Sequence, residues 1–292
     1  LLVVAAYKMW RHRDVDLFII LGIATAVIVL IDTVAGSPLM KNSTLGYDAM
    51  SGARYYGIGN EYEGVIIGAE IIAVAALWEK YHETHRSALK YLTIAFWGIT
   101  ILLMGAPQIG SNVGGTIAAV AAFIFTYMRL TGTKVGVKQL LAIGGSVSLA
   151  VVAFAIFDMN QSVEAQSHLG RMANDMKSGG WQVFWEIAVR KLKMNAKLIR
   201  YTIWSRVFLI MLAALAVSFY RPIGLMEKVR RSYPFIFEGL LGILVGSAVG
   251  LAVNDSGIVA AATMMIFGMA PLIYLMGRER EQDVDSVQMQ GE

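Results

Sequence analysis

Side chains suited to binding or acid–base chemistry gather in residues 42–63, a polar, glycine-rich stretch between two apolar segments. Arg54 is its only arginine, and a guanidinium can clamp a phosphate or carboxylate through two parallel hydrogen bonds. The alternative is that Arg54 binds no ligand: its aliphatic part lies along an apolar surface and its guanidinium reaches the membrane interface. The remaining candidates of this stretch are Tyr55 and Asn60 for substrate binding, Glu61 for catalysis and Glu63 for a proton path.

Three glycine-rich turns place an asparagine or aspartate where an apolar helix is expected to begin, near Asn60, Asn112 and Asp255. Each helix start offers unpaired backbone N–H groups and the positive end of the helix dipole. A cluster of such starts favours a phosphate or a carboxylate, so we predict that these residues and Asn254 bind substrate. The alternative is helix capping, because Asn60 and Glu63 fit a capping box and the other two are common N-cap types.

Two carboxylates concern the interior of the membrane, Glu63 and a second glutamate further along the same apolar segment. Glu70 follows Glu63 by seven residues within one apolar segment, so both lie on nearly the same face of a helix. Ionisable groups inside a membrane are energetically expensive, which makes this pair a candidate path for protons or cations. The alternative is a single carboxyl group that is protonated and hydrogen-bonded to a neighbouring helix.

A long polar segment contains His168 and Arg171, a candidate acid or base and a candidate phosphate ligand. His82 and His85 have a spacing that could hold a metal, but two histidines in a charged loop are typical of a solvated loop. The chain has no cysteine and no GxxxxGK[ST], GxSxG or HExxH motif. We therefore expect no metal, no cofactor and no self-contained metallohydrolase.

The elements that must position these residues are membrane helices. Apolar residues make up 57% of the chain and charged residues 16%, and the mean hydropathy is +0.58. Many apolar windows are near the length of a membrane-spanning helix. We predict an all-α, polytopic transmembrane bundle with a partial span at 1–10 and eight full spans, at 15–36, 60–78, 91–106, 113–130, 140–157, 204–220, 235–253 and 257–276.

Lysine and arginine gather in alternate loops, whereas the three short opposite loops carry only Lys41 and Arg54. The positive-inside rule then predicts a multi-pass protein of the bacterial cytoplasmic membrane whose glycine-rich turns face outward. We expect a transmembrane domain at 1–278, with an extracytoplasmic interfacial segment at 159–203, and a disordered cytoplasmic tail at 279–292. The net charge of +4 is spread over loops, so nucleic acid is not an expected partner.

Residues 181–200 have the pattern of an amphipathic helix, with tryptophans and aliphatic residues on one face and cations on the other. We expect it to lie flat on the outer leaflet and to contact anionic lipid headgroups or a lipid-linked substrate. The alternative is an interfacial brace without a ligand. The basic face consists of Arg190, Lys193, Lys197 and Arg200.

Five motifs in a fixed order resemble a group of little-characterised polytopic membrane proteins of Gram-positive bacteria, over about residues 36–265. In such proteins the membrane region often follows an alkaline-phosphatase-like extracytoplasmic domain. The resemblance therefore implies a longer protein with a hydrolase domain before residue 1, and it identifies no catalytic residue. The motifs are SPL with NSTLGY (37–47), GARYYGIGN (52–60), GSNVGGT (110–116), SHLGR (167–171) and NDSG (254–257).

Three functions remain open at this point. The leading hypothesis is an outward-facing anion-binding vestibule that binds or presents the headgroup of an anionic lipid or lipid-linked glycan, as the membrane part of a hydrolase or transferase of the cell envelope. The second is a secondary transporter or flippase that uses Glu70 as its coupling carboxyl. The third is a structural membrane anchor.

Overall fold

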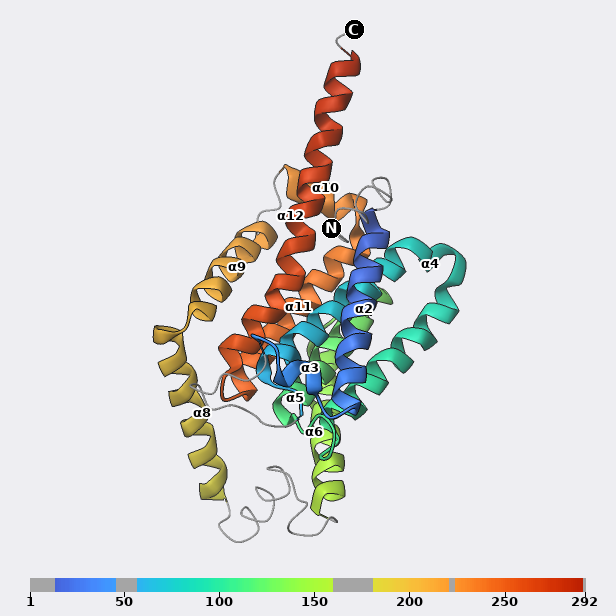
Figure 1. The fold of residues 1–292 in the computed structure, drawn as a ribbon. Helices are drawn as coiled ribbons and strands as arrows, with labels where there is room; N and C mark the ends of the chain where they lie inside the picture. Colours follow the sequence, from blue (N-terminus) through green and yellow to red (C-terminus); the bar gives the residue numbers. More distant parts are fainter. Residues whose placement is uncertain (1–13, 46–56, 160–180, 221–223, 291–292) are drawn as a thin grey trace.

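A computed structural model describes residues 14–45, 57–159, 181–220 and 224–290. Every regular element in these ranges is a helix, so the predicted all-α class is confirmed for this part of the chain (Figure 1). The helices are α2 (Asp14–Val34), α3 (Pro38–Lys41), α4 (Asn60–Gly105), α5 (Val113–Leu130), α6 (Val137–Met159), α8 (Trp181–Tyr201), α9 (Ile203–Tyr220), α10 (Leu225–Ser232), α11 (Pro234–Val253) and α12 (Gly257–Gln290).

Six of the described helices are long and apolar enough to cross a membrane, or seven if α8 and α9, which meet at 89°, form one span. Their outward surfaces carry large apolar side chains, among them Ile31, Leu141 and Leu149, which are 64%, 72% and 71% exposed. Surfaces of this kind suit contact with lipid. The predicted count of eight treats α4 as two spans and α9 as one, and it stays a prediction. The partial span at 1–10 lies outside the described residues.

Helix α4 folds back on itself at His85, the one residue inside it with non-helical backbone angles (φ −132°, ψ 31°). Two hydrogen bonds join the resulting arms. In each bond the two partners lie at nearly equal sequence separations on either side of the bend. Trp78 Nε1 donates to Thr93 Oγ1 at 3.1 Å, and Thr100 Oγ1 donates to Glu70 Oε1. The two apolar segments predicted at 60–78 and 91–106 therefore form the arms of one hairpin, and the basic loop expected between them is helical on both sides of the bend (Figure 1).

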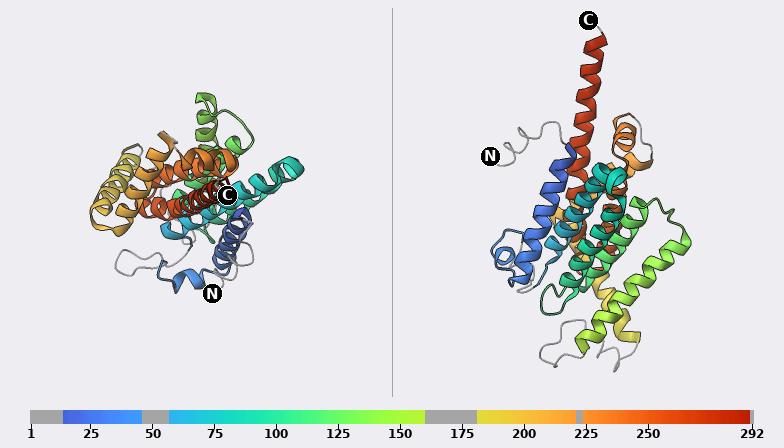
Figure 2. Two further views of the ribbon diagram at one scale, coloured as in Figure 1. Left: turned by 90° about the horizontal axis from the view of Figure 1, so that it is seen from above. Right: turned by 90° about the vertical axis from the view of Figure 1, so that its right-hand side faces the viewer.

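The long helices from α2 to α6 alternate in direction between two ends of the bundle, as do α11 and α12, whereas α8 and α9 run the same way (Figure 1). The bend of α4, helix α10 and the end of α12 lie at one end, which we call the basic end (Figures 1 and 2). Helix α3 and the turns at 106–112 and 254–256 lie at the other, which we call the turn end. The two described glycine-rich turns thus lie apart from the bend of α4 and from α10, which carry basic residues.

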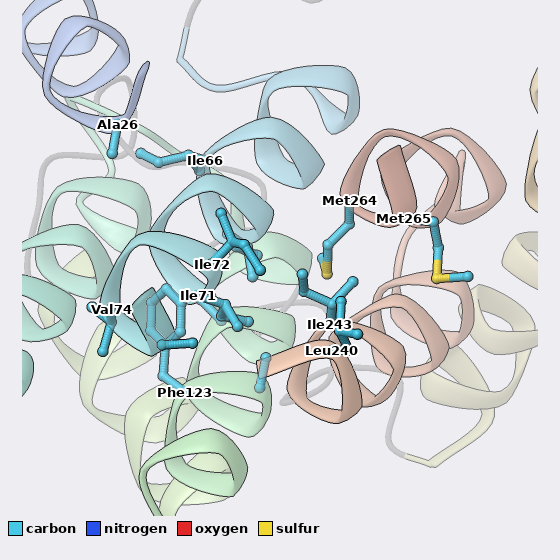
Figure 3. Close-up of a cluster of buried hydrophobic side chains, with 14 of the residues drawn as sticks. Ala26, Ile66, Ile71, Ile72, Val74, Phe123, Leu240, Ile243, Met264 and Met265 are labelled. Carbon is cyan, nitrogen blue, oxygen red and sulfur yellow. The ribbon is translucent and has the colours of Figure 1, made fainter. Parts of the chain in front are cut away.

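The first arm of α4 is the centre of the bundle and packs against α2, α5, α11 and α12. Figure 3 shows its Ile71 meeting Ile243 of α11 and Met264 of α12 in the apolar core. Glycine allows the closest approach. A Cβ atom at Gly64 would lie 2.2 Å from the carbonyl oxygen of Ala260 in α12, so the two backbones are in direct contact. Small residues have this role in many membrane helix pairs.

The expectation of a disordered tail at 279–292 is wrong for most of that range, because α12 continues to Gln290. No glycine or proline interrupts residues 278–290. Extending an existing helix is also far easier than nucleating one. An ion pair one turn apart supports the extension, with Arg278 Nη1 3.0 Å from Glu281 Oε2.

Candidate functional site

Three of the glycine-rich segments meet around the carboxylate of Glu63, at the turn end of the bundle. Glu63 lies in the first turn of α4 and is fully buried. Asn112 Nδ2 donates to its Oε2 at 3.0 Å, and Asn254 Nδ2 donates to its Oε1 at 2.7 Å. We call these three residues the carboxylate–amide site. Both carboxylate oxygens thus accept a side-chain amide, and the two amides come from different helix ends.

Asn112 is placed by its position as the N-cap of α5. Its Oδ1 accepts a hydrogen bond from the backbone N–H of Gly115 at 2.8 Å, which satisfies one free donor of the helix start. Because this N–H requires an oxygen, it fixes the orientation of the amide and turns Nδ2 toward Glu63. The same Nδ2 donates to the carbonyl of Ile58 at 3.1 Å, so the residue also holds the segment that leads into α4.

Asn254 follows the last residue of α11, and its Nδ2 also donates to the carbonyl of Gly250 at 3.1 Å. Its amide lies directly on the backbone of α5. A Cβ atom at Gly114 would be 1.8 Å from Asn254 Oδ1, so no larger residue fits at 114 without displacing the amide. The glycines of the GSNVGGT motif therefore make room for the site as well as for helix packing.

The inner side of α8 holds the turn between α11 and α12. Asn195 Nδ2 donates to the carbonyls of Leu251 and Asn254, at 3.2 and 2.7 Å, and Lys191 Nζ donates to the carbonyl of Val253 at 2.7 Å. Neither residue was predicted as functional. A signal for Asn195 exists, because this amide interrupts the apolar face expected for residues 181–200.

Glu70 lies two turns further along the first arm of α4, about 10 Å from Glu63 along the helix axis. It is fully buried, and its Oε1 accepts the hydroxyl of Thr100, whereas its Oε2 has no hydrogen-bond partner among the described residues. The indole Nε1 of Trp97 is a second buried atom without a partner in this part of the chain. Its ring stacks on Phe123 of α5, with centroids 4.7 Å apart and an interplanar angle of 5°.

The geometry of the carboxylate–amide site favours a charged Glu63. Hydrogen bonds from two amides stabilise the ionised form of a carboxylate. The site also lies at the first turn of α5, where the helix dipole is positive. The side-chain amides of two of these turns are therefore directed at the chain's own Glu63.

Two of the predicted capping interactions are wrong. The N-cap of α4 is Gly59, and Asn60 is the first helical residue. The Glu63 carboxylate accepts the two amides. Asp255 precedes α12 with a largely exposed side chain, and its Oδ1 lies 3.5 Å from Lys191 Nζ. Asp255 therefore contributes to the attachment of α8.

Of the remaining predicted residues, five lie in described helices and four lie outside the described residues. Glu61 is half-buried in the first turn of α4. The four basic residues of α8 are exposed: Arg190, Lys193, Lys197 and Arg200. Four others lie outside the described residues, and their predicted roles stay predictions: Arg54, Tyr55, His168 and Arg171.

Comparison of the chain with protein families, with curated proteins and with solved structures gave no match. The resemblance to membrane proteins of Gram-positive bacteria therefore stays a prediction.

Proposed function

We propose that this chain is a multi-pass protein of the bacterial cytoplasmic membrane that binds anionic lipid headgroups at its outer face through α8. The observation that carries the proposal is the exposure of four cations along this helix. We call them the α8 basic surface: Arg190, Lys193, Lys197 and Arg200. Trp185 and Ile199 of the same helix are 63% and 45% exposed, and such a mixture of cationic, aromatic and aliphatic groups suits the headgroup region of a membrane.

The α8 basic surface is a better anion site than the three helix starts from which the vestibule was predicted. Within the carboxylate–amide site, the donors of Asn112 and Asn254 are already directed at Glu63. A phosphate placed there would meet the charge of a buried carboxylate, and like charges repel strongly in a low-dielectric environment. We therefore assign the anion to the outside of α8 and the carboxylate–amide site to the inside of the bundle.

The inner contacts of α8 support this assignment because they fix how the helix presents its cations. Lys191 and Asn195 attach one side of α8 to the α11–α12 turn. The basic residues flank these two in sequence and have exposed side chains. A lipid phosphate, from a phospholipid or from a lipid-linked glycan, would approach this surface from the surrounding membrane.

The test is the lipid preference of the purified full chain in neutral detergent, measured by native mass spectrometry with phosphatidylglycerol and phosphatidylcholine. Each cation near a membrane surface contributes about 1 kcal/mol to the binding of anionic lipid, so removing four should lower the relative affinity for phosphatidylglycerol at least about tenfold. The variant replaces the α8 basic surface with glutamine. The matched control removes the same charge at the basic end by replacing Arg86, Lys134, Lys138 and Arg231 with glutamine.

The α8 variant should lose most of the preference for phosphatidylglycerol over phosphatidylcholine while its helix content stays unchanged. The control variant should keep most of this preference. Equal preference in the wild-type chain and the α8 variant would refute the proposal. That result would favour the anchor hypothesis.

A further inference from the structure

The two arms of α4 face each other across an unusual polar contact. Thr100 donates to Oε1 of Glu70, but Oε2 of Glu70 and Nε1 of Trp97 are both buried and have no partner among the described residues. Trp97 precedes Thr100 by three residues, so the unpaired donor lies within one helical turn of the carboxyl group's hydroxyl partner. Nearly all buried polar groups in proteins are hydrogen-bonded, which makes this pair of atoms an exception that needs an explanation.

Within residues 14–45, 57–159, 181–220 and 224–290, no cation compensates Glu70. Its one polar contact there is the hydroxyl of Thr100, and its side chain is 0% exposed. Several charged groups of the packed elements α2, α4, α5, α11 and α12 have contacts toward the bundle ends: Asp16 with Lys80, Asp32 with the amides of Leu39 and Met40, Glu63 with Asn112 and Asn254, Glu79 with the amides of Phe235 and Ile236, Arg129 with Glu238, and Arg278 with Glu281 beside Glu279.

An ionised carboxylate in such surroundings is strongly disfavoured, because burial removes its hydration and a single hydroxyl does not replace it. We propose that Glu70 is a proton-binding site in the membrane interior, with the proton on Oε2 and the Thr100 hydroxyl donating to Oε1. Binding forms one O–H bond on Oε2 and neutralises one negative charge. Release returns the proton to water and leaves Oε2 as an anionic acceptor.

Glu63 is the internal comparison for this assignment. Both carboxyl groups are fully buried in the first arm of α4. Glu63 accepts two amide donors, whereas Glu70 accepts one hydroxyl. The same helix therefore carries one carboxyl group that is built to stay charged and one that is built to hold a proton. This inference is independent of lipid binding at α8.

Infrared spectroscopy of the full chain in lipid nanodiscs tests the assignment directly, because a protonated carboxyl group has a C=O stretching band that a carboxylate lacks. At pH 7 exposed aspartates and glutamates are ionised, so the wild-type chain should show the band of a buried acid. Glu70→Gln should remove this band, and Glu63→Gln, the matched control on the same helix, should leave it in place. Thr100→Val should keep the band at a changed frequency, because the bond to Oε1 is lost.

The wild-type chain alone can overturn the proposal, since the absence of a protonated carboxyl band at pH 7 means that Glu70 is ionised. A band that survives in Glu70→Gln, or that is unchanged in frequency in Thr100→Val, assigns the proton to another residue and also refutes it. Circular dichroism of each variant establishes that the helix content is retained. The Thr100 variant keeps the test decisive if the Glu70 variant does not fold.

Discussion

Replacing Asn254 with alanine tests whether the carboxylate–amide site stabilises the fold. The change removes the donor to Glu63 Oε1 at 2.7 Å and the donor to the Gly250 carbonyl at 3.1 Å. A hydrogen bond to a charged group contributes about 1.5–3 kcal/mol and a neutral one about 0.5–1.5 kcal/mol. We therefore expect Asn254→Ala to lower the free energy of unfolding by about 2–4 kcal/mol.

The measurement is equilibrium unfolding of the purified chain by dodecyl sulfate titration in mixed micelles, followed by circular dichroism. Asn42→Ala is the matched control, because Asn42 Nδ2 donates to the carbonyl of Pro38 at 2.8 Å in an exposed position. Water replaces that bond when it is lost, so the control should change the free energy of unfolding by about 0.5 kcal/mol or less.

A double-mutant cycle with Glu63→Gln separates the charge from the rest of the amide's contacts. In the Glu63→Gln background the remaining acceptor is neutral, and Asn254→Ala should lower the free energy of unfolding by at least about 1 kcal/mol less than in the wild-type background. An equal effect in both backgrounds would show that Asn254 does not stabilise a charged Glu63, and the reasoning about this site would then be wrong.

Three further predictions concern Gly114 beside the site, the attachment of α8, and an ion pair at the opposite end of α5. Gly114→Ala should destabilise the chain by about 2 kcal/mol or more, because its Cβ would lie 1.8 Å from the side-chain oxygen of Asn254. The control is Gly144→Ala in α6, where no atom lies within 4 Å of the added Cβ. It should stabilise the chain by about 1 kcal/mol in the same unfolding assay. Asn195→Ala should increase hydrogen exchange of the α11–α12 turn, measured by mass spectrometry, without changing that of α5; equal exchange in the variant and wild type would contradict the contacts of α8. Arg129→Lys should lower the free energy of unfolding by about 1 kcal/mol, because two parallel bonds to Glu238, at 2.6 and 2.7 Å, become one; an unchanged value would mean that the pair adds nothing to stability.

Local signals explain why the sequence predicts the helices well. Apolar length and loop charge depend only on neighbouring residues, and they identify the arms of α4 and the separation of basic connections from glycine-rich turns. The predicted starts of α4 at Asn60 and of α5 at Val113 agree with the structure, and a polar residue lies at or directly before each start, Asn60 and Asn112. The end of α12 is not predicted by polarity, because its polar side chains resemble those of a disordered tail although most of them favour helix.

The composition of the site could be predicted only in part, because its partners are distant in sequence. Asn112 and Asn254 lie 49 and 191 residues from Glu63. The residue types are the same whether an amide caps a helix, binds a ligand or holds a buried carboxylate, and only the tertiary structure selects among these roles. Asn195 illustrates the same limit, since its partners are backbone carbonyls of another turn.

The glycine-rich turns acquire a specific physical reason from this arrangement. A buried carboxylate at a junction of helix ends needs donors on both oxygens, and the structure supplies them from the N-cap of α5 and the C-cap of α11. Those amides reach Glu63 only if the backbone beside them has no Cβ, which is the condition met at Gly114. In the part of the chain that the structure describes, the amides of these motifs are thus directed at an internal carboxylate. The proposal therefore assigns a lipid phosphate to a surface where cations are exposed, as they are on α8.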